Sequence, residues 1–361
     1  MRWDYEQTLG GRLDRRTFLR LAAYGGVGAV GLLTTSLGAS RVFGASLDPS
    51  TLASMEFDVT YSTRIASLPG DAERVRVWMP LPPEAPDQTV TGLTITCPLP
   101  YQIKVERTYG NRLISVETQG EPQPFTLEAR YHIVRRRSEA GPAALDDRAA
   151  QKYLRLTDRV RVTEAVEAFT EEVVGTEKSH YRIAQKACGG IIDLLTYDKK
   201  IPGCGTGDTG WIMRHKRGKC DDYHALYMAM LVSRGVPVRW EQGFPLPYPQ
   251  ADTATSGSLS GDCSGAHCWV SFHDPDAGWV PVDVSEADKQ PAMREFFFGK
   301  LTPNRFKISE GRAVVLNPRQ GHDPLSTFAY AYAEADGLPL IYAENYENTI
   351  SFNITHWEAG E

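Results

Sequence analysis

The chain has 361 residues, of which 42% are hydrophobic, 23% charged and 10% aromatic, and its formal net charge is −6. This composition is typical of globular proteins and argues against disordered, collagen-like and coiled-coil chains. The length allows two domains, each with a core of its own, and the lack of a basic excess argues against nucleic-acid partners.

Residues 1–45 have the pattern of an export signal. Arg15 and Arg16 precede a weakly apolar, Gly- and Ala-rich run that reaches Leu37, and small residues follow it. A basic start, a modest apolar segment and a small-residue end are typical of secretion signals, and the paired arginines indicate the twin-arginine route. The alternative is a retained membrane anchor, but five glycines and Arg41 make this a poor one.

Within this segment, residues 26–31 fit the dinucleotide-binding pattern GxGxxG. That pattern requires a preceding strand and a following helix, and here it lies in the signal core, so we reject it. Without residues 1–45 the net charge is −9. We expect a periplasmic or extracellular protein, exported by the twin-arginine pathway, with no stable membrane insertion after signal cleavage.

Residues 50–137 are predicted to form a β-sandwich-like domain. Apolar and polar residues alternate in segments such as 57–61, 75–78 and 127–131, and prolines and turn residues separate them. About six short strands of this kind are typical of a sandwich. Residues 138–150 are rich in Gly, Ala and Pro and form the predicted linker.

Residues 151–300 form the second predicted domain, which opens with helices at 163–174 and 176–195. The loop at 198–210 contains four glycines. Such a loop could cradle a phosphate, but no Lys-Ser or Lys-Thr pair follows in Walker register. We therefore predict a flexible loop.

Cys220 lies at the predicted start of a helix that ends at Gly235. The free amides and the dipole of a helix N-terminus stabilise a thiolate. Asp221 and Asp222 oppose this effect, so an imidazolium partner is needed. His224, one helical turn after Cys220, could serve as a base, but it ranks behind a histidine later in the chain.

That histidine is His267, at the start of a short strand. Alternation places His267 and Trp269 on one face of the strand and Cys268 on the other. Asp283, in the next predicted strand (279–285), should lie near His267 across the turn. Cysteine, histidine and carboxylate in this order can act as nucleophile, base and orienting acid, with the amides at the helix start as an oxyanion hole.

The cysteines also allow other interpretations. Zinc-ligand types occur together at Cys263, His267, Cys268 and His273. However, the adjacent residues His267 and Cys268 should point to opposite faces of the sheet. The spacing of the four residues also matches no common zinc finger. A disulfide between Cys263 and Cys268, or between Cys188 and Cys204, could form after export.

The sequence resembles the transglutaminase-like family over roughly residues 163–289. The motif around the family's nucleophile resembles Gly218-Lys219-Cys220 together with Arg234–Arg239. The family's His-x-Trp and Gly-Trp-x-x-x-Asp blocks resemble Ala266–Trp269 and Gly278–Asp283. The segment Phe298–Arg305 is similar to the bacterial secreted branch, whose members carry a β-rich N-terminal region.

The resemblance implies an α+β fold, with a papain-like core of helices packed on an antiparallel sheet behind the β-sandwich-like domain. It implies that Cys220 is the nucleophile, His267 the general base and Asp283 the orienting acid. Three further residues are expected to line the site: His224, Trp269 and Gly218. Cys268 and Ser271 depart from the family's usual small and acidic residues after the histidine, which bears on specificity.

We therefore expect an exported thiol enzyme that cleaves peptide or isopeptide bonds through a thioester, with no metal or cofactor. Its partner would be a peptide or protein substrate, such as a cell-envelope peptide. The alternatives are acyl transfer that crosslinks proteins or envelope peptides, and a catalytically silent envelope binding module. Residues 301–361 are predicted to form a β-rich extension packed on the catalytic domain, with a hairpin at Asp336-Gly337.

Overall fold

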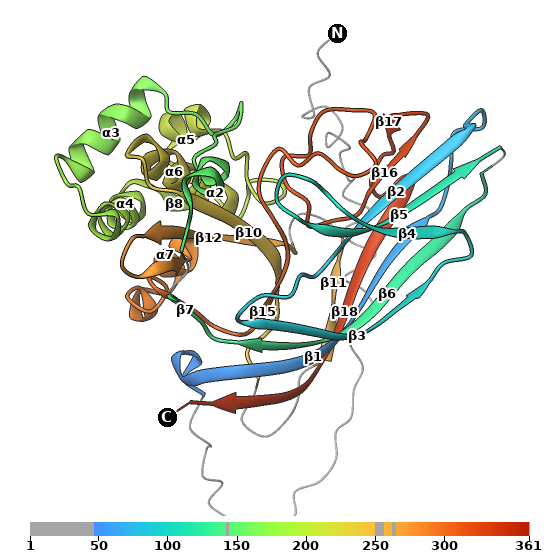
Figure 1. Cartoon of the computed structure of the whole chain (residues 1–361), viewed down its shortest axis with the longest axis horizontal. Helices are drawn as coiled ribbons and strands as arrows, with labels where there is room; N and C mark the ends of the chain where they lie inside the picture. The colour runs from blue at the N-terminus through green and yellow to red at the C-terminus, as the bar shows by residue number, and fades with distance from the viewer. Residues whose placement is uncertain (1–46, 121, 142–143, 250–255, 262–264, 361) are drawn as a thin grey trace, which may run out of the picture. The chain divides into compact units, whose positions relative to one another are not determined.

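The computed structural model describes residues 47–120, 122–141, 144–249, 256–261 and 265–360 (Figure 1). The predicted export signal, the GxGxxG match and Cys263 lie outside these described residues. Residues 46–361 cluster as one unit. Within the described ranges, no helix is both long and apolar enough to cross a membrane.

Two five-stranded antiparallel sheets share one core. Their strand orders are β11-β18-β1-β6-β3 and β17-β16-β2-β5-β4. The bounds are β1 Leu52–Ile65, β2 Arg74–Leu81, β3 Gln88–Thr96, β4 Tyr101–Val105, β5 Arg112–Gln119, β6 Phe125–Arg136, β11 Ser256–Ser260, β16 Tyr332–Ala335, β17 Leu338–Pro339 and β18 Tyr346–Ala359. In β1, Phe57, Val59 and Tyr61 are buried in this core, which is the period-two pattern expected of a strand that packs through one face.

The strand pairing corrects the predicted place of the C-terminal residues. β18 lies between β1 and β11, with Phe57 opposite Ile354. β16 pairs with β2, and the predicted hairpin joins β16 to β17. Residues 332–359 therefore complete the two N-terminal sheets, and the prediction that they pack on the catalytic domain is wrong. Period-two alternation marks a strand but does not specify its partner.

The middle of the chain forms helices packed on a sheet of order β13-β12-β10-β15. The helices are α2 Asp147–Tyr153, α3 Glu164–Val174, α4 His180–Leu194, α5 Thr209–His215, α6 Cys220–Ser233 and α7 Val284–Lys289, with 3-10 turns η1 Pro49–Thr51 and η2 Pro291–Met293. The strands of this sheet are β10 Val238–Pro245, β12 His267–Asp274, β13 Gly278–Val282 and β15 Arg305–Glu310. Two short strand pairs lie outside it. β7 Ser138–Glu139 pairs with β14 Lys300–Leu301, and β8 Thr196–Tyr197 pairs with β9 Arg217–Gly218.

Side-chain caps set the starts of the helices. The Thr163 hydroxyl accepts the N–H of Val166 at the start of α3, and the Ser179 hydroxyl accepts the N–H of Arg182 at the start of α4. The second predicted helix therefore begins after Ser179 and not at residue 176. Such hydroxyl caps satisfy N–H groups that the helix itself leaves unpaired.

α6 is the central helix, and it is buried from Cys220 to Leu231. Neighbouring helices and strands β10 and β12 pack around it, as expected of a helix that is apolar on every side after its polar first turn. β10 and β15 connect this helical core to the core of the two sheets, because Phe244 and Phe306 belong to the latter. α6 also packs on β12, and Cys220 and His267, the first residues of these two elements, are both buried.

Candidate active site

The structure places the imidazole of His267 against the carboxylate of Asp283. His267 Nε2 lies 2.6 Å from Asp283 Oδ2, and both side chains are buried. Val270 pairs with Val282 across the strands, so Asp283 reaches His267 diagonally. β13 ends at Val282, and Asp283 caps α7 by accepting the Glu286 N–H. The strand predicted at 279–285 is therefore too long.

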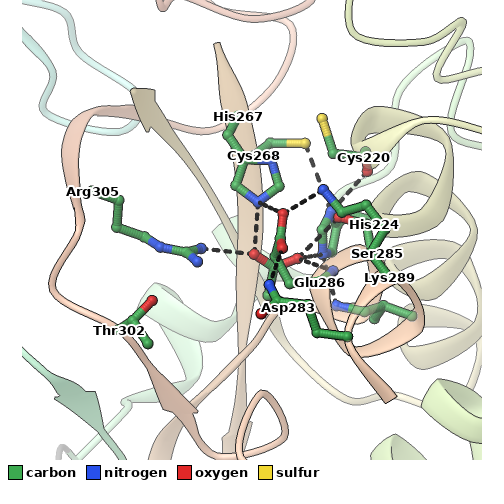
Figure 2. Close-up of polar contacts among 12 residues, drawn as sticks. Cys220, His224, His267, Cys268, Asp283, Ser285, Glu286, Lys289, Thr302 and Arg305 are labelled. Atoms are coloured by element: carbon green, nitrogen blue, oxygen red, sulfur yellow. Dashed lines mark hydrogen bonds and ion pairs between the residues drawn. The ribbon is translucent and has the colours of Figure 1, made fainter. Parts of the chain in front are cut away.

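Asp283 is held by four donors from β12, β15 and α7 (Figure 2). Oδ2 accepts from His267 and from Arg305 Nη1 at 2.7 Å, and Oδ1 accepts from the Ser285 hydroxyl and the Glu286 N–H, each at 3.0 Å. Burial alone would oppose ionisation, but His267 and Arg305 hold the pKa of Asp283 well below its ordinary value. Sequence reasoning missed the role of Arg305, although it singled out Phe298–Arg305 as a family-like segment.

Cys220 is the first residue of α6, and its thiol meets three other side chains. Interactions with the thiols of Cys204 and Cys268, and with His267, hold its pKa well below the ordinary value although burial opposes this. Burial also disfavours the imidazolium of His267, but Asp283 and Cys220 raise its pKa to about 9. A thiolate beside an imidazolium is therefore favoured near neutral pH, which makes the thiol nucleophilic.

The glycine-containing loop between β8 and α5 surrounds the carboxylate of Asp222. Asp222 accepts the N–H groups of Thr206, Gly207 and Lys219 at 2.8, 3.0 and 2.8 Å. At Gly205 the φ angle is +127°, and an added Cβ would lie 2.3 Å from Asp222 Oδ2. The loop predicted to be flexible is thus anchored to the start of α6. Burial and Asp221 raise the pKa of Asp222 to about 6.

The other acid beside the thiol is paired. Arg312 forms a buried ion pair with Asp221, and its guanidinium lies 4.3 Å from the centre of the Trp240 ring. This pairing offsets the negative charge that the sequence places next to Cys220. The partner comes from far along the chain, after β15, and no local pattern indicated it.

His224 lies inside the protein with both ring nitrogens bonded, so it is a satisfied core group, one of the two roles that its sequence position allowed, the other being a residue at the rim of the site. Its Nδ1–H donates to the Cys220 carbonyl at 2.7 Å, and its Nε2 accepts the Val284 N–H at 3.1 Å. Burial lowers its pKa, so the ring is neutral and ties the start of α6 to the start of α7.

The two other residues expected to line the site are also buried. Trp269 is fully buried, with the Arg305 guanidinium 5.2 Å from its ring centre. At Gly218 an added Cβ would lie 2.3 Å from Asp222 Cβ. Burial does not distinguish them from the reactive groups, which are buried as well, and their place in the lining of the site stays a prediction.

The cysteines in the described part of the chain form no disulfide: Cys97, Cys188, Cys204, Cys220 and Cys268. The Cys188–Cys204 disulfide, which the sequence left open, is thus not formed in this structure, and Cys268 has no disulfide partner among the described residues. Because His267 and Cys268 both interact with the Cys220 thiol, strict alternation fails at the start of β12.

The zinc-ligand types that the sequence places close together do not meet in the structure: Cys263 lies outside the described residues, and His267 and His273 are apart. His273 lies at the far end of β12 from His267, about 20 Å along an extended strand. A different set of potential ligands, His267, Asp283 and Glu286, lies within 4.8 Å. Two cations already neutralise these carboxylates, since Arg305 pairs with Asp283 and Lys289 with Glu286.

Comparison with known proteins supports the interpretation of this region. The family profile described as the transglutaminase-like superfamily matches residues 167–284. A Haemophilus influenzae protein named "Uncharacterized protein" is 25% identical over 214 residues, which are 53% of this chain and 58% of its own length. The Bacillus subtilis protein YebA, also uncharacterized, is 28% identical over 84 residues, which are 23% of this chain and 11% of its own length. This chain thus spans little more than half of the first relative and a small part of the second.

Among solved structures, a Cytophaga hutchinsonii protein named "putative cysteine protease" aligns with a TM-score of 0.50 at 13% identity, over 83% of this chain and 98% of its own. The periplasmic domain of TgpA from Pseudomonas aeruginosa aligns with a TM-score of 0.33 at 16% identity, over 68% of this chain and 92% of its own. This chain has a transglutaminase-like fold of helices and antiparallel sheets with a β-rich N-terminal part, as predicted.

Proposed function

We propose that this chain is an exported thiol hydrolase that cleaves peptide or isopeptide bonds through a thioester on Cys220. The observation that carries the proposal is the 2.6 Å contact between buried His267 and Asp283, next to a thiol whose pKa is lowered. The paired arginines and apolar run within residues 1–45 support export to the periplasm or the cell exterior.

In the first half of the reaction, the Cys220 thiolate attacks the amide carbonyl carbon, and the carbonyl electron pair moves to oxygen. The amides of the first turn of α6 lie at the positive end of the helix dipole and stabilise the oxyanion. Because His267 Nε2 faces Asp283, Nδ1 carries the proton that is given to the amine. The C–N bond then breaks and leaves the thioester.

In the second half, neutral His267 takes a proton from water, and the resulting hydroxide attacks the thioester carbonyl. The C–S bond breaks, Cys220 leaves as a thiolate, and His267 is again an imidazolium. Asp283 keeps the same ring orientation throughout, as the acid of a nucleophile–His–Asp set does. A primary amine that attacks in place of water gives acyl transfer, which is the alternative outcome of the same intermediate.

The test is incubation with a peptide and isopeptide library, read by mass spectrometry, with and without an added primary amine. Wild type and the matched control Cys188→Ser, which removes a different buried thiol, should cleave equally. Cys220→Ala should lower the rate by at least about 10³-fold. Amide products with the added amine would instead establish transfer. Cleavage that survives in Cys220→Ala would refute the proposal, and a chain without any product would be a binding module.

A further inference from the structure

The surroundings of the Cys220 thiol contain more sulfur than the proposed reaction uses. Cys268 follows His267 directly on β12, and Cys204 lies in the loop between β8 and α5. Neither forms a disulfide in the structure. A proton-transfer partner and an orienting acid are all that the hydrolysis requires of neighbouring side chains, so the two additional thiols need another explanation.

Cys268 is the thiol better placed to reach Cys220. Its Sγ lies 3.7 Å from His224 Nδ1, and that nitrogen lies 2.7 Å from the Cys220 carbonyl oxygen. Figure 2 shows the sulfur atoms of Cys220 and Cys268 turned toward each other, and the two thiols interact. α6 and β12 pack directly together, so the two thiols come from neighbouring elements.

Cys204 also interacts with the Cys220 thiol, but its contacts differ from those of Cys268. Its Sγ lies 3.8 Å from the Ala266 carbonyl oxygen, and its backbone oxygen lies 3.8 Å from the Cys220 sulfur. A disulfide from Cys204 would therefore require its side chain to turn away from Ala266, in a loop that Asp222 holds by several hydrogen bonds.

We propose that Cys268 is the resolving thiol of Cys220, so that a hydroperoxide converts the pair to a reversible Cys220–Cys268 disulfide. The inference rests on the reactivity of Cys220 in the proposed function, and it adds a modification site to it. The disulfide would block the nucleophile and protect it from irreversible oxidation.

The chemistry balances in two steps. The Cys220 thiolate attacks one oxygen of the hydroperoxide, an S–O bond forms, the O–O bond breaks, and hydroxide or alkoxide leaves. Cys220 is now a sulfenic acid, oxidised by two electrons. The sulfur of Cys268 then attacks the sulfenic sulfur, an S–S bond forms, and the S–O bond breaks. The departing hydroxide takes the Cys268 proton and becomes water.

Cys220 and Cys268 differ in protonation state in the way that these two reaction steps require. Burial raises the pKa of Cys268 well above its ordinary value, so Cys268 stays protonated while Cys220 is the thiolate. Peroxides react with thiolates rather than with thiols. Oxidation therefore starts at Cys220, and Cys268 acts only after the sulfenic acid has formed beside it.

The experiment treats the reduced full chain with a small molar excess of hydrogen peroxide, followed by non-reducing digestion and mass spectrometry. We expect a Cys220–Cys268 linkage that dithiothreitol removes, with return of Cys220 labelling by iodoacetamide. In Cys268→Ser, Cys220 should pass to sulfinic and sulfonic acid, and at least about fivefold less labelling should return. Cys188→Ser, which removes a buried thiol outside the site, should behave as wild type.

A linkage of Cys220 to Cys204 or to any other cysteine would overturn the proposal, as would full recovery of labelling in Cys268→Ser. Because the readout is a covalent mass and needs no substrate, it is independent of the hydrolysis test. A chain that forms the disulfide but cleaves nothing would count against the proposed function alone.

Discussion

The ion pair between Arg305 and Asp283 allows a quantitative test of how the site is held. The two groups lie 2.7 Å apart, with side chains 4% and 0% exposed. At an effective dielectric constant of about 20, Coulomb's law limits their attraction to about 6 kcal/mol. Removing one member of a buried pair costs about 3–5 kcal/mol. Asp283 keeps its other donors in Arg305→Met, so we expect this variant to lose about 3 kcal/mol of unfolding free energy, the lower end of that range.

The assay is urea unfolding at pH 7 of wild type, Arg305→Met, Asp283→Asn and the double variant. Because the two side chains touch, their effects should be non-additive by at least about 1 kcal/mol. The matched control is Arg64→Met, since the Arg64–Glu347 pair has a similar distance of 2.8 Å but side chains 59% and 50% exposed. It should cost less than about 1 kcal/mol.

The pH dependence of this loss has a definite sign. The pKa of Asp283 is lowered in the folded state, so its ionic contribution is present above the unfolded-state pKa and is lost as pH falls through the folded value. The difference in unfolding free energy between wild type and Arg305→Met should therefore become smaller as the pH falls. A loss no larger than that of the exposed control, or additive effects in the cycle, would refute this account.

Three further predictions concern the start of α6 and the C-terminal strand. Alkylation of Cys220 should remain fast at pH 6.5 in wild type and fall at least about tenfold in His267→Ala, because the imidazolium is lost; equal rates would exclude this partner. Gly205→Ala should lower the unfolding free energy more than Gly92→Ala, because both have positive φ but only Gly205 would clash, with Asp222; equal losses in urea titrations would mean that the clash is relieved. Deletion of β18 should abolish cooperative thermal unfolding, because β18 lies between β1 and β11, and a native-like melting curve would contradict this pairing.

Much of the arrangement around Cys220 could be predicted because the information is local. Small-residue and capping patterns mark where α6 begins and ends, and the short connection between β12 and β13 keeps Asp283 near His267. The helix start at Cys220 and the proximity of His267 and Asp283 follow from these features. The catalytic role of the three residues stays a prediction that the experiments above would test.

The groups that tune the site come from distant segments and were not predicted. Arg305 and Arg312 reach Asp283 and Asp221 only because β15 pairs with β10. An ion pair between a buried arginine and a distant carboxylate depends on how the chain folds, and no local pattern in a single sequence indicates which two residues will pair. The burial of His224 likewise depends on α7 packing against α6.

The sequence by itself therefore determined the strand pattern of the N-terminal region, the helix that begins at Cys220, the transglutaminase-like character of the middle region and the three residues of the candidate site. Periodicity, caps and short turns act over a few residues, and those signals are present in the chain itself. The tertiary structure alone decided that β18 joins the N-terminal sheet, that buried arginines neutralise the acids beside the thiol, and that Cys268 faces Cys220. These contacts join residues far apart in the chain or on different elements, where packing and charge pairing in the folded protein select the partner.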